Sequence, residues 1–263
     1  MKIILDIQRS NPQAGVEPYY QQYTVEAEPT ERVLDALMTI KRSQDGSLAF
    51  RRSCAHGVCG SDAMRINGTE RLACKTLIRD VAEKSGDVIR IEPLEHFPVQ
   101  RDLMVDQSGF FARYRSVKPF LVAAVGVNER EHIQSPEERV KIDDPTKCIL
   151  CSACFSACPV LSENPRFLGP AAIVQAGRFV FDSRDRGLEP RLDVLDQENG
   201  VWPCENHFQC TRVCPRGIKV TKLINLTKRE IKRYREERGE ETAEKAEEEA
   251  KRGAEEAPEE GRT

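Results

Sequence analysis

Apolar and polar residues alternate in two stretches near the N-terminus, residues 2–7 and residues 19–26. Such alternation is typical of β-strands that bury one face. Turn-forming residues, 11–18, separate the two stretches, and the pattern therefore predicts a β-hairpin. Further along the chain, residues 87–91 alternate in the same way and predict another strand.

A helical pattern follows the predicted hairpin. Thr30 is a residue type that caps helices, and the apolar residues after it recur at the spacing of one helix face. These apolar residues are Val33, Leu34, Leu37 and Met38. Later, Asn67-Gly68 lies between residues 62–66 and 71–73 and is a signal for a type I′ hairpin. Strands around a single helix predict a small α+β domain over residues 1–105.

The middle of the chain has the longer period of helices. Residues 110–117, 171–181 and 220–234 are expected to be helical, and Ser135-Pro136 is typical of a helix start. These elements predict an all-α domain over residues 106–236. The charged tail, residues 237–263, has too few apolar residues to bury a face and is expected to be helical in part or disordered. An acidic docking segment is the alternative.

Composition narrows the classes of function. The 263 residues carry 32% charged side chains with a net charge of −3, which favours neither nucleic acid nor an anionic membrane as a partner. No window approaches the roughly 18–20 apolar residues of a membrane span, and the N-terminus becomes polar too soon for a signal peptide. Ten cysteines in such a chain indicate metal binding in a reducing compartment rather than disulfides.

The cysteines from Cys148 to Cys158 give the strongest chemical signal. Their spacing, C-x2-C-x2-C-x3-C followed by Pro159, is the one with which bacterial-type ferredoxins bind iron–sulfur clusters. The first three cysteines of that motif bind one cluster, and the fourth reaches a second cluster. Residues 204–215 supply the expected partner motif, C-x5-C-x3-C-P. The ligands lie too densely along the chain for structural zinc sites of four ligands each.

Counting assigns these seven cysteines to two sites. The ligands of a [4Fe–4S] site would be Cys148, Cys151, Cys154 and Cys214. The cysteines that remain are Cys158, Cys204 and Cys210. A complete second motif would have one more cysteine at position 207, but that residue is His207. Three thiolates and a missing corner indicate [3Fe–4S]; a fourth iron bound by the His207 imidazole is the alternative.

A further site is expected in the first domain. Cys54-x4-Cys59, with Cys74 further on, follows the spacing of plant-type [2Fe–2S] proteins, except that Asp62 stands in place of the third cysteine. A carboxylate carries one negative charge, as a thiolate does, so Asp62 can complete the four ligands with an altered potential. The alternative is that Asp62 only hydrogen-bonds the loop. His56 is a metal ligand by chemistry but lies off the expected spacing.

These motifs together resemble the iron–sulfur subunits of succinate:quinone oxidoreductases, the succinate dehydrogenases and fumarate reductases. The resemblance covers residues 1 to about 235, in order. The matching phrases are Arg51-Arg52-Ser53-Cys54, Leu72-Ala73-Cys74-Lys75, Gly169-Pro170-Ala171-Ala172 and Cys210-Thr211-Arg212-Val213-Cys214-Pro215. The fold that this resemblance implies is α+β: a β-grasp plant-type [2Fe–2S] ferredoxin domain followed by an all-α bacterial-type ferredoxin domain.

The resemblance also implies a function. A separate flavoprotein subunit with FAD would oxidise succinate, and electrons would pass through [2Fe–2S], [4Fe–4S] and [3Fe–4S] to quinone at one or more membrane-anchor subunits, with or without heme b there. This chain would lie peripherally on the cytoplasmic side of the membrane and carry no succinate chemistry of its own. Fumarate reduction would use the same centres, and a free-standing multi-cluster carrier is the further alternative.

The sequence departs from the family near the expected quinone site. Many members carry an aromatic residue shortly after the Cys-Pro pair, whereas this chain continues from Pro159 with Val160-Leu161-Ser162. Many members also have a histidine directly after the next cysteine, where this chain has Glu205. By resemblance, Pro159 is therefore the single expected quinone contact. We expect His207 to lie near the three-iron cluster.

Overall fold

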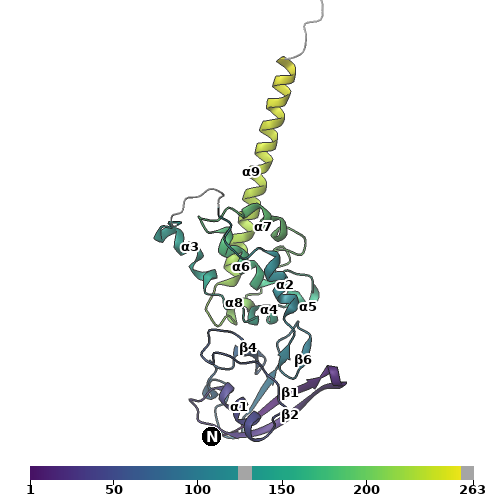
Figure 1. The fold of residues 1–263 in the computed structure, drawn as a ribbon, viewed down its shortest axis with the longest axis vertical. Coiled ribbons are helices and arrows are strands. Elements are labelled where there is room, and N and C mark those ends of the chain that lie inside the picture. Colours follow the sequence, from purple (N-terminus) through teal and green to yellow (C-terminus); the bar gives the residue numbers. More distant parts are fainter. Residues whose placement is uncertain (124–131, 256–263) are drawn as a thin grey trace, which may run out of the picture.

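The alternating N-terminal stretches form the predicted hairpin. β1 (Lys2–Asn11) pairs antiparallel with β2 (Val16–Glu26), and a short 3₁₀ turn, η1 (Pro12–Ala14), joins them. The computed structural model describes residues 1–123 and 132–255, with side chains described as far as residue 239. Figure 1 shows the β-sheet at one end of the molecule and helices above it.

The remaining strands of the first domain come together on the other side of β1. β5 (Val88–Glu92) runs parallel to β1, with Ile4 opposite Val88, and β3 (Ala63–Ile66) pairs antiparallel with β5. The predicted Asn67-Gly68 turn joins β3 to β4 (Thr69–Leu72). The strand order is therefore β2-β1-β5-β3-β4. The 3₁₀ helix η2 (Ile78–Asp80) and a small separate sheet of β6 (Val99–Arg101) and β7 (Met104–Val105) complete the domain.

The predicted helix forms but begins later than expected. Helix α1 (Val33–Ser43) has Arg32 at its N-cap, so the prediction that Thr30 caps it is wrong. The reason is local pairing: Arg32 forms a β-bridge with Leu77, which keeps the chain extended up to that residue. The Asp35 carboxylate then accepts a hydrogen bond from the Arg32 backbone N–H and satisfies the free end of the helix.

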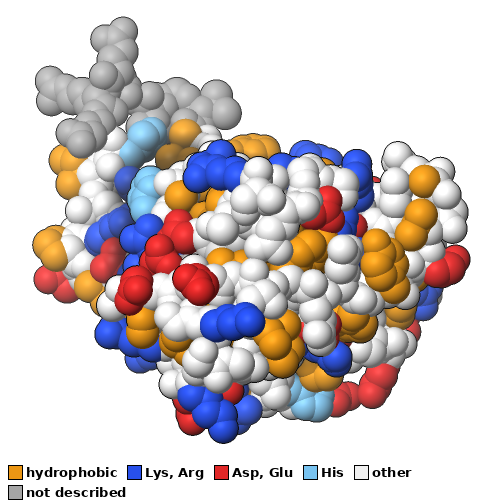
Figure 2. Space-filling model, turned by 90° about the horizontal axis from the view of Figure 1, so that it is seen from below, with side chains coloured by type: hydrophobic (Ala, Val, Ile, Leu, Met, Phe, Trp, Pro, Cys, Tyr) orange, Lys and Arg blue, Asp and Glu red, His pale blue; other side chains and the backbone are white. Residues whose placement is uncertain are grey.

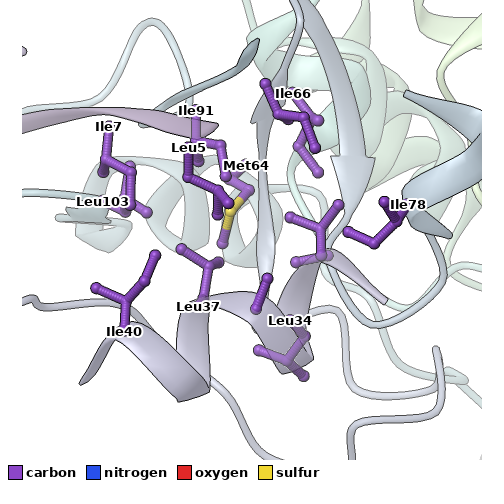
Figure 3. Close-up of a cluster of buried hydrophobic side chains, with 14 of the residues drawn as sticks. Leu5, Ile7, Leu34, Leu37, Ile40, Met64, Ile66, Ile78, Ile91 and Leu103 are labelled. Atoms are coloured by element: carbon purple, nitrogen blue, oxygen red, sulfur yellow. The ribbon is translucent and has the colours of Figure 1, made fainter. Parts of the chain in front are cut away.

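One apolar core lies between α1 and the sheet. Alternate residues of β1 and β5 point toward the same face of the helix, as Figure 3 shows for Leu5, Ile91 and Leu37. The period of two in the strands and of 3.6 in the helix places these side chains together. Cys151 and Ala153, from far along the chain, also belong to this core. The first domain is therefore completed by residues of the cysteine run.

The second part of the described chain is helical. The helices are α2 (Ser108–Ser116), α3 (Pro136–Thr146), α4 (Ala153–Ser156), α5 (Val160–Glu163), α6 (Pro170–Val180), α7 (Leu188–Leu195), α8 (Gln209–Arg212) and α9 (Val220–Glu255). Helix α6 is largely buried and packs against α2, α3, α7 and α9. Gly177 of α6 faces Leu223 of α9 so closely that an added β-carbon would lie 3.2 Å from the leucine side chain. This small residue lets the two helices pack closely.

The helix starts follow their local chemistry. Ser135 accepts a hydrogen bond from the Glu138 backbone N–H, and the Glu138 carboxylate accepts one from the Ser135 backbone N–H. This capping box confirms the predicted helix start before Pro136. The last helix, α9, continues through the charged tail to Glu255 and projects away from the other helices in Figure 1. The last part of the tail, residues 256–263, lies outside the described residues.

A buried ion pair supports the helical part. The Arg191 guanidinium of α7 is fully buried and bonds both oxygens of Asp185, and it also donates to the backbone carbonyl of Lys118 over 3.1 Å. Burying a charge is costly unless it is paired, and here Arg191 and Asp185 pair with each other. The hydrogen bond to Lys118 joins α7 to the segment that follows α2. Neither α7 nor this ion pair is predicted from the sequence.

Aromatic contacts attach the segment after β5 to the core of the helical part. Phe97, which follows β5, lies 5.1 Å from Phe155 of α4 and 6.2 Å from Phe110 of α2, measured between ring centroids.

The outer face of the molecule seen in Figure 2 carries basic, acidic and apolar side chains interspersed, in keeping with the small net charge. Within residues 1–123 and 132–255, no helix combines the length and the apolar character needed to cross a bilayer.

Candidate metal centres

The first candidate centre lies in the loop before β3. Cys54 and Cys59 are partly exposed, and three backbone N–H groups of the loop point at the Cys54 sulfur. These donors, from His56, Cys59 and Val58, lower the pKa of the Cys54 thiol to about 6. Hydrogen bonds to sulfur favour the thiolate, which is the form that binds iron.

The loop has the backbone shape that this arrangement needs. Gly57 has a φ of +80°, and a β-carbon there would lie 2.7 Å from the Lys75 side chain. The close approach brings the loop against the segment that carries Cys74. Glycine is favoured because the left-handed conformation and the close contact both oppose a larger side chain.

Asp62 and Cys74 lie together on the buried side of this loop. The Asp62 carboxylate accepts a hydrogen bond from the Cys74 backbone N–H over 2.6 Å. Burial, and after it the neighbouring Asp62, raise the pKa of the Cys74 thiol to about 12. The hydrogen bond uses one carboxylate oxygen, Oδ2, and leaves Oδ1 for other contacts. Asp62 thus makes the hydrogen bond to the loop that one prediction describes. It also lies beside Cys74, as the prediction that Asp62 is a ligand requires.

His56 points elsewhere. Its ring nitrogen Nδ1 lies 2.6 Å from the backbone carbonyl oxygen of Cys54, and the side chain is exposed. The imidazole therefore contacts the backbone of its own loop. A neighbour that the sequence reasoning missed is Ser61, whose hydroxyl lies 3.1 Å from the Cys59 sulfur.

The second candidate centre is a cavity of about 380 Å³, counting space open to solvent, between the cysteine run and the segment before α9. The cysteines in its wall are Cys148, Cys151, Cys154 and Cys214. Leu150 and Ser152 have φ values of +54° and +67°, so the chain winds tightly between these cysteines. Apolar side chains, among them Val174 and Ile218, form much of the remaining wall.

Burial controls the charge of these thiols. Burial, with a smaller contribution from nearby thiols, raises the pKa of Cys151 to about 12 and the pKa of Cys154 well above the usual range. A metal that binds here must displace protons, since thiolates are the ligands. Gln175 of α6, which is buried, hydrogen-bonds the Cys148 side chain. This bond lowers the pKa of the Cys148 thiol, which burial raises. No sequence signal identified Gln175.

The third candidate centre is a neighbouring cavity of about 300 Å³, counted in the same way. Its cysteines are Cys158, Cys204 and Cys210. Burial raises the pKa of the Cys158 thiol to about 11. The Cys210 sulfur lies 3.5 Å from the Thr221 hydroxyl of α9, another neighbour that no motif indicated. Cys154 of the second centre lies in α4 and Cys158 of the third follows directly after that helix, so the second and third centres adjoin.

Pro159 and His207 both line this third cavity. His207 is exposed, and its Nε2 lies 3.1 Å from a carboxylate oxygen of Glu205. Pro159 and His207 also border an open groove toward the β-sheet domain, together with Glu70 and Ser156.

The donor set fits iron–sulfur clusters better than a single ion. In residues 1–123 and 132–239, no three His, Cys, Asp or Glu side chains converge as ligands of one ion. The cysteines instead surround cavities from several sides. A cluster keeps its ligands apart by its own width, and soft thiolates are its usual ligands.

The first two centres are in direct contact. Gly60, next to Cys59, has a φ of +69°, and a β-carbon there would lie 2.6 Å from the β-carbon of Cys151. The loop of the first centre therefore packs on a cysteine of the second. The three candidate centres follow one another from the β-sheet domain into the helical part.

Comparisons with known proteins agree with these sites. A family model described as a 2Fe-2S iron-sulfur cluster binding domain matches residues 4–112, and a 4Fe-4S dicluster domain matches residues 144–218. The succinate dehydrogenase iron-sulfur subunit of Coxiella burnetii is 39% identical over 86% of this chain and 95% of its own length. The fumarate reductase iron-sulfur subunit of Mycobacterium tuberculosis is 42% identical over 82% of this chain and 87% of its own length.

A solved structure is similar as well. A chain of the Mycobacterium smegmatis Sdh1 complex in the apo form superposes with a TM-score of 0.80 at 29% identity, covering 88% of this chain and 96% of that one. The similarity in sequence and in structure extends over both parts of the molecule.

Proposed function

The chain belongs to the iron–sulfur subunits of succinate dehydrogenase and fumarate reductase, and we propose that it carries electrons from a flavoprotein subunit to quinone through three clusters. As an electron-transfer subunit of an oxidoreductase, it supplies the positions of the centres and their surroundings. The clusters supply the one-electron redox chemistry.

We assign a [2Fe–2S] cluster to the first centre. The proposed ligands are Cys54, Cys59, Asp62 and Cys74. The short contact between Asp62 and the Cys74 backbone supports this set, because it keeps a carboxylate beside a buried thiol. The loop N–H groups that favour the Cys54 thiolate support it further.

The two cavities of the helical part would hold a [4Fe–4S] and a [3Fe–4S] cluster. For the first of these, the proposed ligands are Cys148, Cys151, Cys154 and Cys214. For the second they are Cys158, Cys204 and Cys210. The contact of His207 with Glu205, and its exposure, favour three thiolates alone over an added imidazole ligand.

One observation carries the proposed order of the centres along the electron path. Gly60 packs directly on Cys151, so the loop of the first centre and a proposed ligand of the second share van der Waals contact. Cys154 lies in α4 and Cys158 follows directly after it, so the second centre adjoins the third. A series of adjoining centres is what stepwise electron transfer requires.

The finer fold assignment rests on the pairing of the strands. The parallel pair of β1 and β5, with α1 packed across the sheet, supports a β-grasp ferredoxin for the first domain, residues 1–105. The described helices support an all-α ferredoxin domain for residues 106–236. Residues 237–263 then form a charged extension, whose described part continues α9.

The partners follow from the family. We propose an FAD-containing flavoprotein subunit near the first centre and one or more membrane-anchor subunits, with or without heme b, near the third. Pro159, in the wall of the third cavity, is the proposed quinone contact. The chain would then lie peripherally on the cytoplasmic side of the membrane, without binding nucleic acid. The physiological direction, succinate oxidation or fumarate reduction, depends on potentials relative to the quinone.

Redox-titrated EPR of the purified complex tests this function. We expect about nine irons per chain with acid-labile sulfide, three distinct signals, and co-purification with a flavoprotein. A chain that isolates alone, as a free-standing carrier would, or that contains zinc instead of iron, would contradict the proposal.

A further inference from the structure

Ser156 lies between the second and third centres and connects them to the β-sheet domain. It is the middle residue between Cys154 and Cys158 and is 1% exposed. Its hydroxyl donates a hydrogen bond of 2.8 Å to Oε1 of Glu70 and accepts one of 2.8 Å from the Glu95 backbone N–H. Both bonds fix the orientation of the hydroxyl. Glu70 is thereby tied to the segment that carries the two cysteines.

The Glu70 carboxylate is buried without a full counter-charge. Glu70 lies on β4 and is 7% exposed. Its nearest cation is Arg65, whose Nε lies 4.0 Å from Oε1. Arg65 also pairs with Glu92 over 3.5 Å and with Glu95 over 2.7 Å. Arg65 is therefore shared among three carboxylates. Arg90 also interacts with Glu92 but is itself paired with Asp6 over 3.2 Å, so a negative charge remains near Ser156.

Glu70 shares a groove with a proposed ligand of the third centre. Glu70, Ser156 and Cys158 line the same groove, together with Pro159 and His207. Cys154 does not line this groove. Because Glu70 is itself buried and its hydrogen bond reaches Ser156, two residues before Cys158, its charge acts on the site of Cys158 through the protein as well as across the groove, and solvent screens it less than a surface charge.

We propose that Glu70 is a positioning residue that, through Ser156, lowers the reduction potential of the centre at Cys158, Cys204 and Cys210. Adding an electron to a centre is less favourable next to a fixed negative charge, and net charge and hydrogen bonding are among the terms that set cluster potentials. The inference rests on the proposed function, since it requires a cluster at this site. It assigns to a residue of the β-sheet domain the control of a centre in the helical domain.

The test is the midpoint potential of the third centre in the purified complex, measured by redox-titrated EPR. Glu70→Gln removes the charge but keeps an oxygen that can accept the Ser156 hydrogen bond. We expect the electron affinity of the third centre to rise about tenfold, which corresponds to about 59 mV for one electron. The midpoint of the first centre should stay at its original value. An unchanged third midpoint would overturn the proposal.

Two further variants separate charge from packing. Glu95→Gln removes a carboxylate that shares the same Arg65 but has a side chain 49% exposed, and we expect little change in the third midpoint. Glu70→Asp keeps the charge, and its third midpoint should lie closer to that of the parent than the midpoint of Glu70→Gln does. If Glu70→Asp raises the midpoint as much as Glu70→Gln does, the effect is one of packing and the proposal is wrong.

The same measurements distinguish failure of this inference from failure of the proposed function. If the parent complex lacks a three-iron signal, the assignment of the third centre is wrong. If the signal is present in the parent and in Glu70→Gln at one and the same potential, only the role of Glu70 is refuted. Thermal unfolding of each variant, measured alongside, reports whether the fold is retained.

Discussion

Gly60 lies against Cys151 so closely that no side chain fits between them: an added β-carbon would be 2.6 Å from the cysteine β-carbon and 2.8 Å from its α-carbon. The two residues are 91 positions apart in the sequence. Their contact joins the loop of the first centre to the second. It also explains why Cys151 takes part in the apolar core of the β-sheet domain.

Gly60→Ala should therefore disturb both centres. The substitution combines a left-handed backbone with a backbone clash, and we expect a loss of about 2–4 kcal/mol in the free energy of unfolding. The signal of the second centre should weaken with it in EPR. Gly68→Ala is the matched control, since Gly68 has a φ of +74° but nothing within 4 Å of an added β-carbon. It should cost about 1 kcal/mol and leave the second centre intact.

Asp62→Asn distinguishes the two roles of Asp62. The amide oxygen can still accept the hydrogen bond from the Cys74 backbone, but the charged ligand is lost. If Asp62 binds iron, the [2Fe–2S] signal should be lost or strongly changed, and the iron content should fall by up to about two per chain. A normal signal and full iron content would mean that Asp62 only orders the loop. Asp62→Cys should restore a cluster with an altered potential.

His207→Ala tests the composition of the third centre. With three thiolate ligands, the three-iron EPR signal should persist, and its midpoint should shift if His207 lies close enough to tune it. Loss of a four-iron signal in the variant would instead identify the imidazole as a ligand. An identical signal and midpoint in parent and variant would show that His207 does not influence the centre.

Arg191→Met should be among the most destabilising single changes in the helical part. It leaves the Asp185 carboxylate buried without its partner, which costs about 3–5 kcal/mol. Arg139→Met is the control: Arg139 pairs with Asp143 over 3.0 Å on the surface of α3, and losing it should cost at most about 1 kcal/mol. Denaturant unfolding of both variants measures the difference. Equal losses would contradict the structural role of Arg191.

Asp45 gives the first domain a pH-dependent contribution to stability. Hydrogen bonds from Ser47 and then from Tyr23 hold the pKa of the Asp45 carboxyl well below its usual range. A depressed pKa stabilises the fold above the unfolded value of about 3.9, and this contribution is lost as the pH falls below it. Asp45→Asn should thus be less stable than the parent by about 1–3 kcal/mol at pH 7.

The pH dependence itself is the check on that prediction. The difference between Asp45→Asn and the parent should shrink as the pH falls below about 4, in denaturant unfolding followed by circular dichroism. Glu17→Gln, at an exposed position on β2, controls for the general effect of removing a carboxylate. A difference that stays constant down to acid pH would contradict the linkage.

Local chemistry predicted much of the first domain. Residues that alternate in character became β1, β2 and β5, and the Asn67-Gly68 turn and the Ser135 cap lie where their residue types require. Thr30 failed as a cap because Arg32 pairs with a segment 45 residues away, which no local pattern reports. In the tail, helix α9 extends to Glu255 because Ala, Glu and Lys favour helix, although few apolar residues are present to be buried.

The candidate centres were predictable where ligands repeat at fixed spacing. The cysteines are recognisable because a cluster demands its ligands at close intervals. Their surroundings were not: Gln175, Thr221 and Ser156 are common polar residues that gain meaning only when the chain brings them to a sulfur or to a carboxylate. The same holds for Gly60, whose partner is set by the docking of two domains.

The cavity lined by Cys148, Cys151 and Cys154 is closed by Cys214, which the ribosome adds about 60 residues later. During synthesis, the early cysteines of the run emerge while their fourth partner has still to be made. The loop of Cys54 and Cys59, by contrast, has its partner Cys74 soon after. The ligand set of the first centre is therefore complete early in synthesis, while the cysteine run stays without its fourth ligand until Cys214 is added.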